Sequence, residues 1–455
     1  MGLRPFKGDR RAYLTETPVP QLICTLAGPT ILSMLVTGIY NSADTYFVGR
    51  ISTQGTAAVG LVFSVMAIIQ AMGFFCGQGS GNYLSRLLGA GERQKADEIA
   101  VTGFVLALIL GLLLAVFGNL FARPFADLLG ATDSTRRETI SYLRIILLGA
   151  PFMMGQCVIN NQLRFQGSAF YAMIGLMCGA AVNIVLDPLL MFGFELGIPG
   201  AAIATISGQF IGFCTLLIGS RRGENIRLDL RNIRLSAPNL LQIVNGGLPS
   251  LVRQGLASVS VVLLNRFANA YGGDAAIAGM SIVNRTMMLL TSALIGFGQG
   301  YQPVCSFNYG AKLYGRVREG FFFCVKYGTL LMSLAAALCL LFPTQIVAFF
   351  RNDPAVIAVG ATALRWQASA LPLMATSILT NMMLQASGQG LRSSITSSAR
   401  NGIFFIPLIL TLPRLLGLRG VEMTQACADV LTFLLCLPFL RASLRRMKQA
   451  EEENR

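Results

Sequence analysis

The chain of 455 residues is 54% apolar and only 13% charged, with a formal net charge of +15 and no histidine. Soluble globular domains carry roughly 25% charged residues, so this composition argues against a soluble enzyme. The basic residues lie in short breaks between long apolar runs rather than on one solvated face. The charge therefore indicates membrane topology rather than nucleic-acid binding.

Twelve apolar runs follow one another along the chain, and a membrane-crossing helix needs roughly 20 such residues. They lie near residues 21–48, 55–84, 99–122, 142–164, 169–193, 200–219, 242–268, 275–306, 321–346, 356–386, 393–415 and 420–440. We predict an all-α integral membrane protein with twelve transmembrane helices. Lys and Arg are concentrated in alternate breaks, which places both termini in the cytoplasm. The first twenty residues are polar, so we expect no removable signal peptide.

The residues that punctuate the apolar runs recur at a spacing of about 220 residues. The matched positions are Pro29 with Pro249, 77–79 with 298–300, 89–90 with 310–311, Arg144 with Arg365, Pro151 with Pro372, Asn160 with Asn381, Pro188 with Pro407 and Gly200 with Gly420. We predict two six-helix bundles related by pseudo-two-fold symmetry: an N-lobe at 1–220, a basic cytoplasmic linker at 221–238, and a C-lobe with a cytoplasmic tail at 239–455. A cleft between parallel repeats suits a substrate that is moved by alternating access.

Several kinds of chemistry have no support in this sequence. The ten cysteines lie in apolar stretches without a CxxC pair, and no histidine is present, so we expect no disulfide, no metal cluster and no enzymatic activity. Gly77, Gly79 and Gly81 do not have the spacing of a phosphate-binding loop, and we predict that they serve close helix packing. Without an ATP site, the energy for transport comes from an ion gradient, a partner ATPase or the gradient of the substrate itself.

Three carboxylates, Asp44, Asp187 and Asp429, fall inside apolar runs, where a charge costs about 2.5–3.5 kcal/mol on insertion scales. Asn183 lies one helical turn before Asp187, and Thr205 follows in the next run. Carboxylate, amide and hydroxyl oxygens suit a small cation such as Na⁺, and two neighbouring acids also suit H⁺ transfer. The alternative is that these acids only hold helices together.

These residues resemble the multidrug and toxic compound extrusion (MATE) transporters, over nearly the whole chain. The resemblance rests on Pro29, YNSADTYFVG at 40–49, SRLLGAG at 85–91, NIVLDP at 183–188 and GAAIAT at 200–205. It is closest to the DinF- and MepA-like bacterial branch. The resemblance implies two lobes in a V shape around a central cleft, and export of organic cations or amphiphilic drugs in exchange for Na⁺ or H⁺.

The resemblance also implies roles for particular residues. It assigns a cation site to Asp44, Asn183, Asp187 and Thr205, a bending first helix to Pro29, and substrate contacts to Met34, Thr37, Tyr40 and Asn160. No cofactor beyond the coupling ion is implied. We expect a monomer in a bacterial inner membrane that handles small molecules, binds no nucleic acid and contributes to antibiotic resistance. The NorM-like branch uses C-lobe acids, whereas this chain has Arg253 there, so coupling is assigned to the N-lobe.

Arg253 and Arg285 are predicted to be buried charges of the C-lobe together with Asp429. One interpretation is that the two arginines form a gate or contact an anionic part of the substrate. Another is an ion pair with Asp429 or bonds to carbonyl groups at helix ends. Arg253 and Arg285 also leave open a second function. In a flippase for lipid-linked oligosaccharides or peptidoglycan precursors, the two arginines would hold a pyrophosphate.

Overall fold

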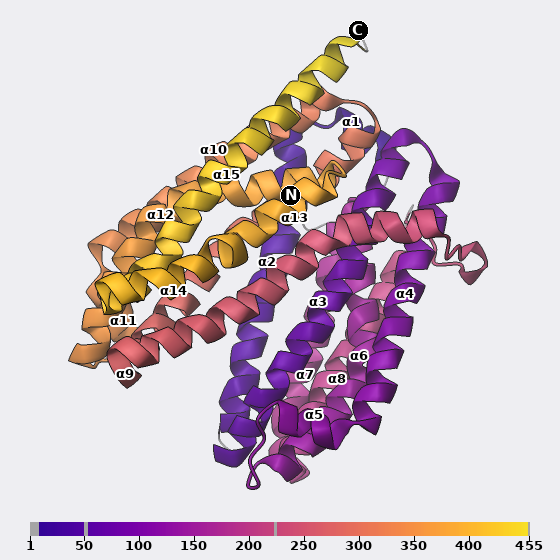
Figure 1. Ribbon diagram of the computed structural model, residues 1–455. Coiled ribbons are helices and arrows are strands. Elements are labelled where there is room, and N and C mark those ends of the chain that lie inside the picture. Colours follow the sequence, from indigo (N-terminus) through magenta and orange to yellow (C-terminus); the bar gives the residue numbers. More distant parts are fainter. Residues whose placement is uncertain (1–8, 50–52, 223–224, 454–455) are drawn as a thin grey trace. The chain divides into compact units, whose positions relative to one another are not determined.

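The computed structural model describes residues 9–49, 53–222 and 225–453, and within these it leaves out the side chains of 38–46, 48–49 and 53–54. The described chain is almost entirely helical and contains no strand (Figure 1). This confirms the predicted all-α fold, and it follows from the long apolar runs, whose backbone groups must bond internally within a bilayer.

The first half of the chain forms eight α-helices and two short turns of other helical type. These are α1 Arg10–Glu16, α2 Val19–Gly49, α3 Thr53–Ala90, α4 Arg93–Leu120, α5 Ala122–Leu128, α6 Arg136–Phe165, α7 Ala169–Pro188, the π-helical η1 Leu189–Gly193, α8 Gly197–Ser220 and the 3₁₀ turn η2 Leu230–Asn232. Helix α6 lies against α3, α4 and α8, and α7 pairs with α8 (Figure 1).

The second half repeats this pattern with fewer breaks. Its elements are α9 Ala237–Gly310, α10 Tyr314–Leu341, α11 Pro343–Phe350, α12 Pro354–Ala386, α13 Gly390–Ser398, the π-helical η3 Ala399–Ile403, α14 Phe405–Leu416 and α15 Leu418–Glu453. Helix α12 packs on α10, α11 and α15, and α14 packs on α15. Asp353 caps the start of α12 by accepting from the Ala355 N–H at 2.9 Å, with Pro354 in the first turn.

The described helices supply the twelve predicted crossings. Ten of them are long and apolar enough to span a membrane. The 74-residue α9 counts as two, because Gly273 interrupts it with φ 62° and ψ −155°. Helix α12 adds the twelfth by its length of 33 residues. The break in α9 falls in the predicted gap between 268 and 275, whereas α5 and α11 were not predicted as separate helices.

Contacts along the chain divide it into two compact units. The first contains the described residues up to Thr17 together with Cys24–Gly247, and the second contains Pro18–Ile23 and the described residues from Leu248 onward. Each unit has its own apolar core, which includes Leu143, Leu147 and Ala150 in the first and Leu364, Leu371 and Ala375 in the second. The lobe boundaries at 220 and 239 stay a prediction.

Matching hydrogen bonds in the two units support the internal repeat. Asn160 Nδ2 donates to the carbonyl of Ala172 at 2.9 Å, and Asn381 Nδ2 donates to the carbonyl of Ser393 at 2.7 Å. Helices α6 and α12 both end in a glycine in the left-handed region, Gly167 with φ +79° and Gly388 with φ +81°. In each case the next residue's N–H bonds to the carbonyl five residues back, which is the Schellman cap that favours glycine.

The glycines of the 77–81 segment lie where helices approach closely, as predicted. A Cβ on Gly77 would lie 2.9 Å from Asn161 Nδ2, and one on Gly81 would lie 2.4 Å from the Phe165 ring. A Cβ on Gly79 would lie only 2.2 Å from the carbonyl oxygen of Ile243. Small residues therefore let α3 contact α6 and the start of α9 with almost no side chain between them.

Candidate functional site

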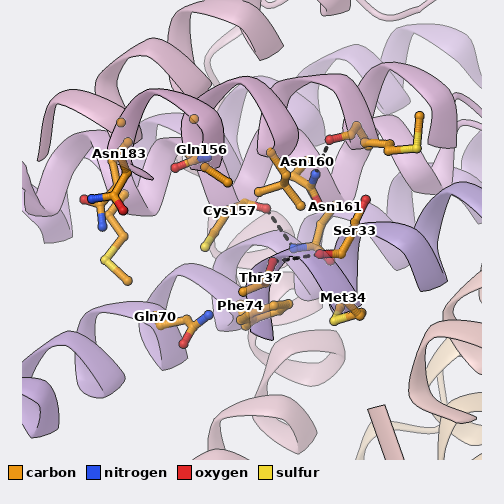
Figure 2. A pocket seen from close by; sticks show the side chains of 18 of the residues that line it. Ser33, Met34, Thr37, Gln70, Phe74, Gln156, Cys157, Asn160, Asn161 and Asn183 are labelled. Carbon is orange, nitrogen blue, oxygen red and sulfur yellow. Dashed lines mark hydrogen bonds between the residues drawn. The ribbon is translucent and has the colours of Figure 1, made fainter. Parts of the chain in front are cut away.

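A cavity of about 190 Å³ with a mixed polar and apolar lining lies inside the first unit and is lined by α2, α3, α6, α7 and α8. Figure 2 shows side chains from these helices converging on it. Its described lining residues are Thr30, Ser33, Met34, Thr37, Phe63, Met66, Ala67, Gln70, Phe74, Met153, Gln156, Cys157, Asn160, Asn161, Arg164, Ala169, Ala172, Met173, Leu176, Gly179, Ala180, Asn183, Thr205, Gly208 and Gln209. Its lining combines amides and hydroxyls with thioethers and the rings of Phe63 and Phe74, which suits an amphiphilic ligand.

Three of the four residues assigned to substrate line this cavity. Met34 and Thr37 contribute from α2, and Asn160 contributes from α6 (Figure 2). The side chain of Tyr40 lies outside the described residues. Asn160 Nδ2 donates to the Ala172 carbonyl, and this hydrogen bond joins α6 to α7 at the cavity wall. The hydrogen bond fixes the position of the Asn160 side chain. A fixed position suits a residue that presents a defined polar edge to a ligand.

Helix α2 turns one polar face to the cavity immediately after Pro29. Ser33 Oγ donates to the Pro29 carbonyl at 2.8 Å. Thr37 Oγ1 donates to the Ser33 carbonyl, also at 2.8 Å (Figure 2). Pro29 has no N–H for the carbonyl four residues earlier, and hydroxyls that bond back to the helix favour bending. These features weaken the backbone hydrogen bonding of α2 around Pro29.

Two of the residues assigned to the cation line the same cavity, and a third lies beside it. Asn183 and Asp187 stand one turn apart on α7, with Asn183 Nδ2 donating to Asp187 Oδ1 at 3.4 Å. Asp187 is fully buried, and Asn183 and Thr205 are each 2% exposed. The side chain of Asp44, which completes the predicted set, lies outside the described residues.

Helix α8 contributes Thr205 to the cavity that Asn183 lines, and small residues let α7 and α8 approach closely. A Cβ on Gly208 would lie 2.7 Å from the Gly179 carbonyl oxygen and 3.0 Å from Asn183 Cβ. Among the described residues, Asn183 Oδ1 and Thr205 Oγ1 are buried without a hydrogen-bond partner. Each such atom costs about 1–3 kcal/mol when it is left unpaired. Two such oxygens lining one cavity, with a carboxylate one helical turn from Asn183, fit the ligand set of a small cation.

A second polar group, which was not predicted from the sequence, consists of Asn161 and Arg164 in the cavity wall and Gln78 bonded to Asn161. Asn161 Oδ1 accepts from Gln78 Nε2 at 3.0 Å and from Arg164 Nη2. Arg164 stands at the end of an apolar run, where it was counted among the cytoplasmic charges. The amides of Gln156, Asn160 and Asn161 within that run are the signal that would have indicated a polar helix face.

The charged residues of the second unit differ from the prediction in their burial and in the partner of Asp429. Asp429 is 3% exposed and pairs with Arg400 at 2.6 Å, and Gln425 Nε2 donates to it at 3.1 Å. Neither Arg253 nor Arg285 is its described ion-pair partner. Arg253 is half-buried and Arg285 is exposed, so the expectation that both are buried was wrong, whereas Asp429 is buried as expected. The ion pair with Asp429, one of the interpretations left open, is made by another arginine. Arg400 lies in η3, which packs on α15, and this contact is not visible in the sequence.

Two repeated bundles of helices long and apolar enough to span a membrane, one of which contains a cavity lined partly by amides and hydroxyls, are typical of membrane transport proteins. A family model for MatE matches residues 29–189 and 249–411, one segment in each repeat, and the chain belongs to this family. It is similar to the multidrug export protein MepA of Staphylococcus haemolyticus, with 28% identity over 441 residues that cover 96% of this chain and 97% of that protein. MepA of Staphylococcus aureus strain MRSA252 is 28% identical over 433 residues, covering 93% and 94%.

Solved structures share the fold over the full length. A MOP superfamily transporter from Pyrococcus furiosus is 26% identical with a TM-score of 0.90, covering 97% of this chain and 99% of that one. A MATE protein crystallised in a bent and in a straight conformation is 26% identical with a TM-score of 0.91 in both forms, covering 98% of this chain and 100% of that one. These matches confirm the family and the arrangement of helices predicted from sequence.

Proposed function

We propose that this protein exports amphiphilic drugs and organic cations across a bacterial inner membrane, in exchange for Na⁺ or H⁺. The observation that carries the proposal is the cavity of the first unit described above. It combines the oxygen atoms of Asn183 and Thr205 with the contact surface of Met34, Thr37 and Asn160. The naming of the staphylococcal relatives as multidrug export proteins supports the choice of cargo.

In the proposed cycle, the coupling cation binds Asp44, Asn183, Asp187 and Thr205. The cargo contacts Met34, Thr37, Tyr40 and Asn160 in the same cavity. Because α2 lines the cavity beyond Pro29, bending of α2 changes the space that is left for cargo. A cation that binds one form of α2 and cargo that binds the other shift the same equilibrium in opposite directions. Alternating access and exchange both follow from this competition.

The proposal also includes the organisation predicted from sequence. An N-lobe at 1–220 and a C-lobe at 239–455 move as units joined by the basic linker at 221–238, with both termini in the cytoplasm. The protein acts as a monomer, requires no cofactor besides the coupling ion, and is not an enzyme.

The test is transport in proteoliposomes with gradients of Na⁺ and of pH imposed separately. Fluorescence of ethidium reports its movement. We expect one gradient to drive ethidium against its concentration, and that gradient identifies the coupling ion. If neither gradient drives ethidium faster than in liposomes containing the Asp187→Asn variant, the exchange function is contradicted.

A further inference from the structure

The lining of the cavity in the first unit is rich in sulfur, and the proposed exchange uses only one of these side chains. Five of the 25 described lining residues carry sulfur, whereas the whole chain has 18 Met and 10 Cys among 455 residues. Sulfur is thus about three times as frequent in the lining as in the chain. The five side chains come from four helices: Met34 from α2, Met66 from α3, Met153 and Cys157 from α6, and Met173 from α7.

The packing of α6 holds several of these side chains at the cavity. Met153 and Cys157 lie one helical turn apart on α6 and therefore share a face. The hydrogen bond that Asn160 donates to α7 is accepted by the residue immediately before Met173, which is 5% exposed. Helix α3 has no side chain at Gly73, and a Cβ there would lie 3.3 Å from Cys157 Sγ. The thiol of Cys157 therefore lies directly against α3.

Thiols and thioethers are soft ligands, and they select soft metal ions such as Cu⁺ rather than hard cations such as Na⁺. The chain has no histidine, and no three Cys, Asp or Glu side chains in its described part are grouped to hold a metal ion. A soft-metal site in the described residues therefore has to include thioethers. Methionine has three rotatable bonds, so thioethers from different helices can close on one ion. Figure 2 shows Met34 and Cys157 among the side chains around the cavity.

Cys157 allows a monovalent metal ion to bind without a change in the charge of the cavity. The ion replaces the proton of the thiol: the S–H bond breaks, a bond between sulfur and the metal forms, and the proton passes to water. The cavity then has the same charge as before binding. The Arg164 guanidinium, which lines the same cavity, therefore meets no added positive charge.

The internal repeat shows that the fold does not require the thiol. At the repeat spacing of 221 residues, Cys157 corresponds to Ile378 and Met153 corresponds to Met374. Ile378 is half-buried within α12, so the same place in the second unit accommodates an apolar side chain without sulfur. Met374 keeps the thioether and is 3% exposed in the core of the second unit. The combination of thiol and thioethers thus belongs to the cavity of the first unit.

We propose that Cys157 and the four methionines of the lining form a binding site for a soft monovalent metal ion, Cu⁺ or its analogue Ag⁺. This inference goes beyond the proposed export of drugs, because the site rests on the lining of the cavity and not on ion exchange. The bound ion occupies the cavity that the proposed cargo enters at Met34. Metal ion and cargo therefore exclude each other.

The test is the affinity of the purified full-length protein for Ag⁺, measured by isothermal titration with silver nitrate in a chloride-free buffer and a non-ionic detergent. Ag⁺ is the probe because, unlike Cu⁺, it is not oxidised by air. The background protein carries alanine in place of the other cysteines that are exposed or half-buried, which are Cys24, Cys178, Cys214 and Cys427. Of the six cysteines that remain, Cys157 is the one that is not buried.

We expect the background protein to bind one Ag⁺ tightly. Replacing the four methionines together by leucine, at Met34, Met66, Met153 and Met173, keeps their apolar volume and removes the thioethers. The affinity of this four-leucine variant for Ag⁺ should fall about tenfold or more, because even changes that only reposition metal ligands cost about ten- to hundredfold. The affinity of the Cys157→Ala variant should fall at least as far.

Controls separate the site from folding and from general effects of methionine. Met374→Leu removes the thioether at the repeat position of Met153 and should leave the affinity for Ag⁺ unchanged. Size-exclusion chromatography checks that every variant remains folded. Excess Na⁺ should not displace Ag⁺ from soft ligands. Displacement by Na⁺ would assign the ion to oxygen ligands such as Asn183 and Thr205 and overturn the proposal.

Three further results would overturn the sulfur site. A background protein that binds no Ag⁺ has no such site. A four-leucine variant that binds Ag⁺ as tightly as the background protein shows that the thiol alone holds the ion. An equal loss of affinity in Met374→Leu traces the effect to the fold rather than to the cavity.

The titration fails or succeeds independently of transport. Absence of Ag⁺ binding in a protein that exports ethidium overturns the metal site alone. Thioether-dependent Ag⁺ binding in a protein that exports nothing contradicts the exchange function and leaves the metal site in place.

Discussion

Replacing Asp187 by Asn is expected to abolish cation-driven export while leaving the protein folded and inserted. Asp187 is fully buried beside Asn183, and the substitution keeps the shape of the side chain but removes its charge. Loss of one charge-assisted interaction of about 1.5–3 kcal/mol weakens cation binding about ten- to hundredfold. The initial rate of ethidium export from proteoliposomes under an imposed gradient measures the effect.

A matched control for Asp187→Asn is Asp127→Asn in the same unit. Asp127 is half exposed and pairs with Arg136 at 2.8 Å on the surface, where an ion pair contributes little. This variant should export at the wild-type rate. Full export by Asp187→Asn at normal protein levels would show that this carboxylate does not couple the ion to the cargo.

Substituting Gly79 by Ala is expected to destabilise the first unit by about 1–3 kcal/mol, the usual cost of an overpacked core. The added Cβ would lie 2.2 Å from a backbone oxygen, that of Ile243, so a backbone segment must move rather than a flexible side chain. Thermal unfolding of the purified protein should show a lower midpoint. Gly60→Ala on the same helix is the control, because a Cβ there meets nothing within 4 Å. Equal unfolding midpoints for the two variants would contradict the close contact at Gly79.

The architecture was predictable because its signals are repeated and strong. The apolar runs predicted the membrane crossings. Residues that recur at a fixed spacing, such as Asn160 and Asn381, predicted the internal repeat, and these two asparagines make the same hydrogen bond in both units. The α9 break at Gly273 was indicated by adjacent glycines between two apolar runs. Some helices extend beyond their apolar runs into polar sequence, as α6 does at its start.

The site was only partly predictable, because its remaining features depend on contacts between distant segments. Nothing in the local sequence pairs Asp429 with Arg400, since η3 and α15 meet only in the folded unit. Arg285 lies on an exposed helix face, which composition alone does not distinguish from a buried one. The place of Arg164 in the cavity wall was not predicted for a different reason: its position at the end of an apolar run also fits a charge in a cytoplasmic break.

The central claim is that one cavity of the first unit binds the coupling cation and the cargo in competition. The most direct measurement is the affinity of ethidium for the purified protein, titrated with and without Na⁺ and at two pH values, for the wild type and Asp187→Asn. We predict that Na⁺ or a lower pH weakens ethidium binding to the wild type and has no effect on the variant. A wild-type affinity that is indifferent to both Na⁺ and pH would contradict the account.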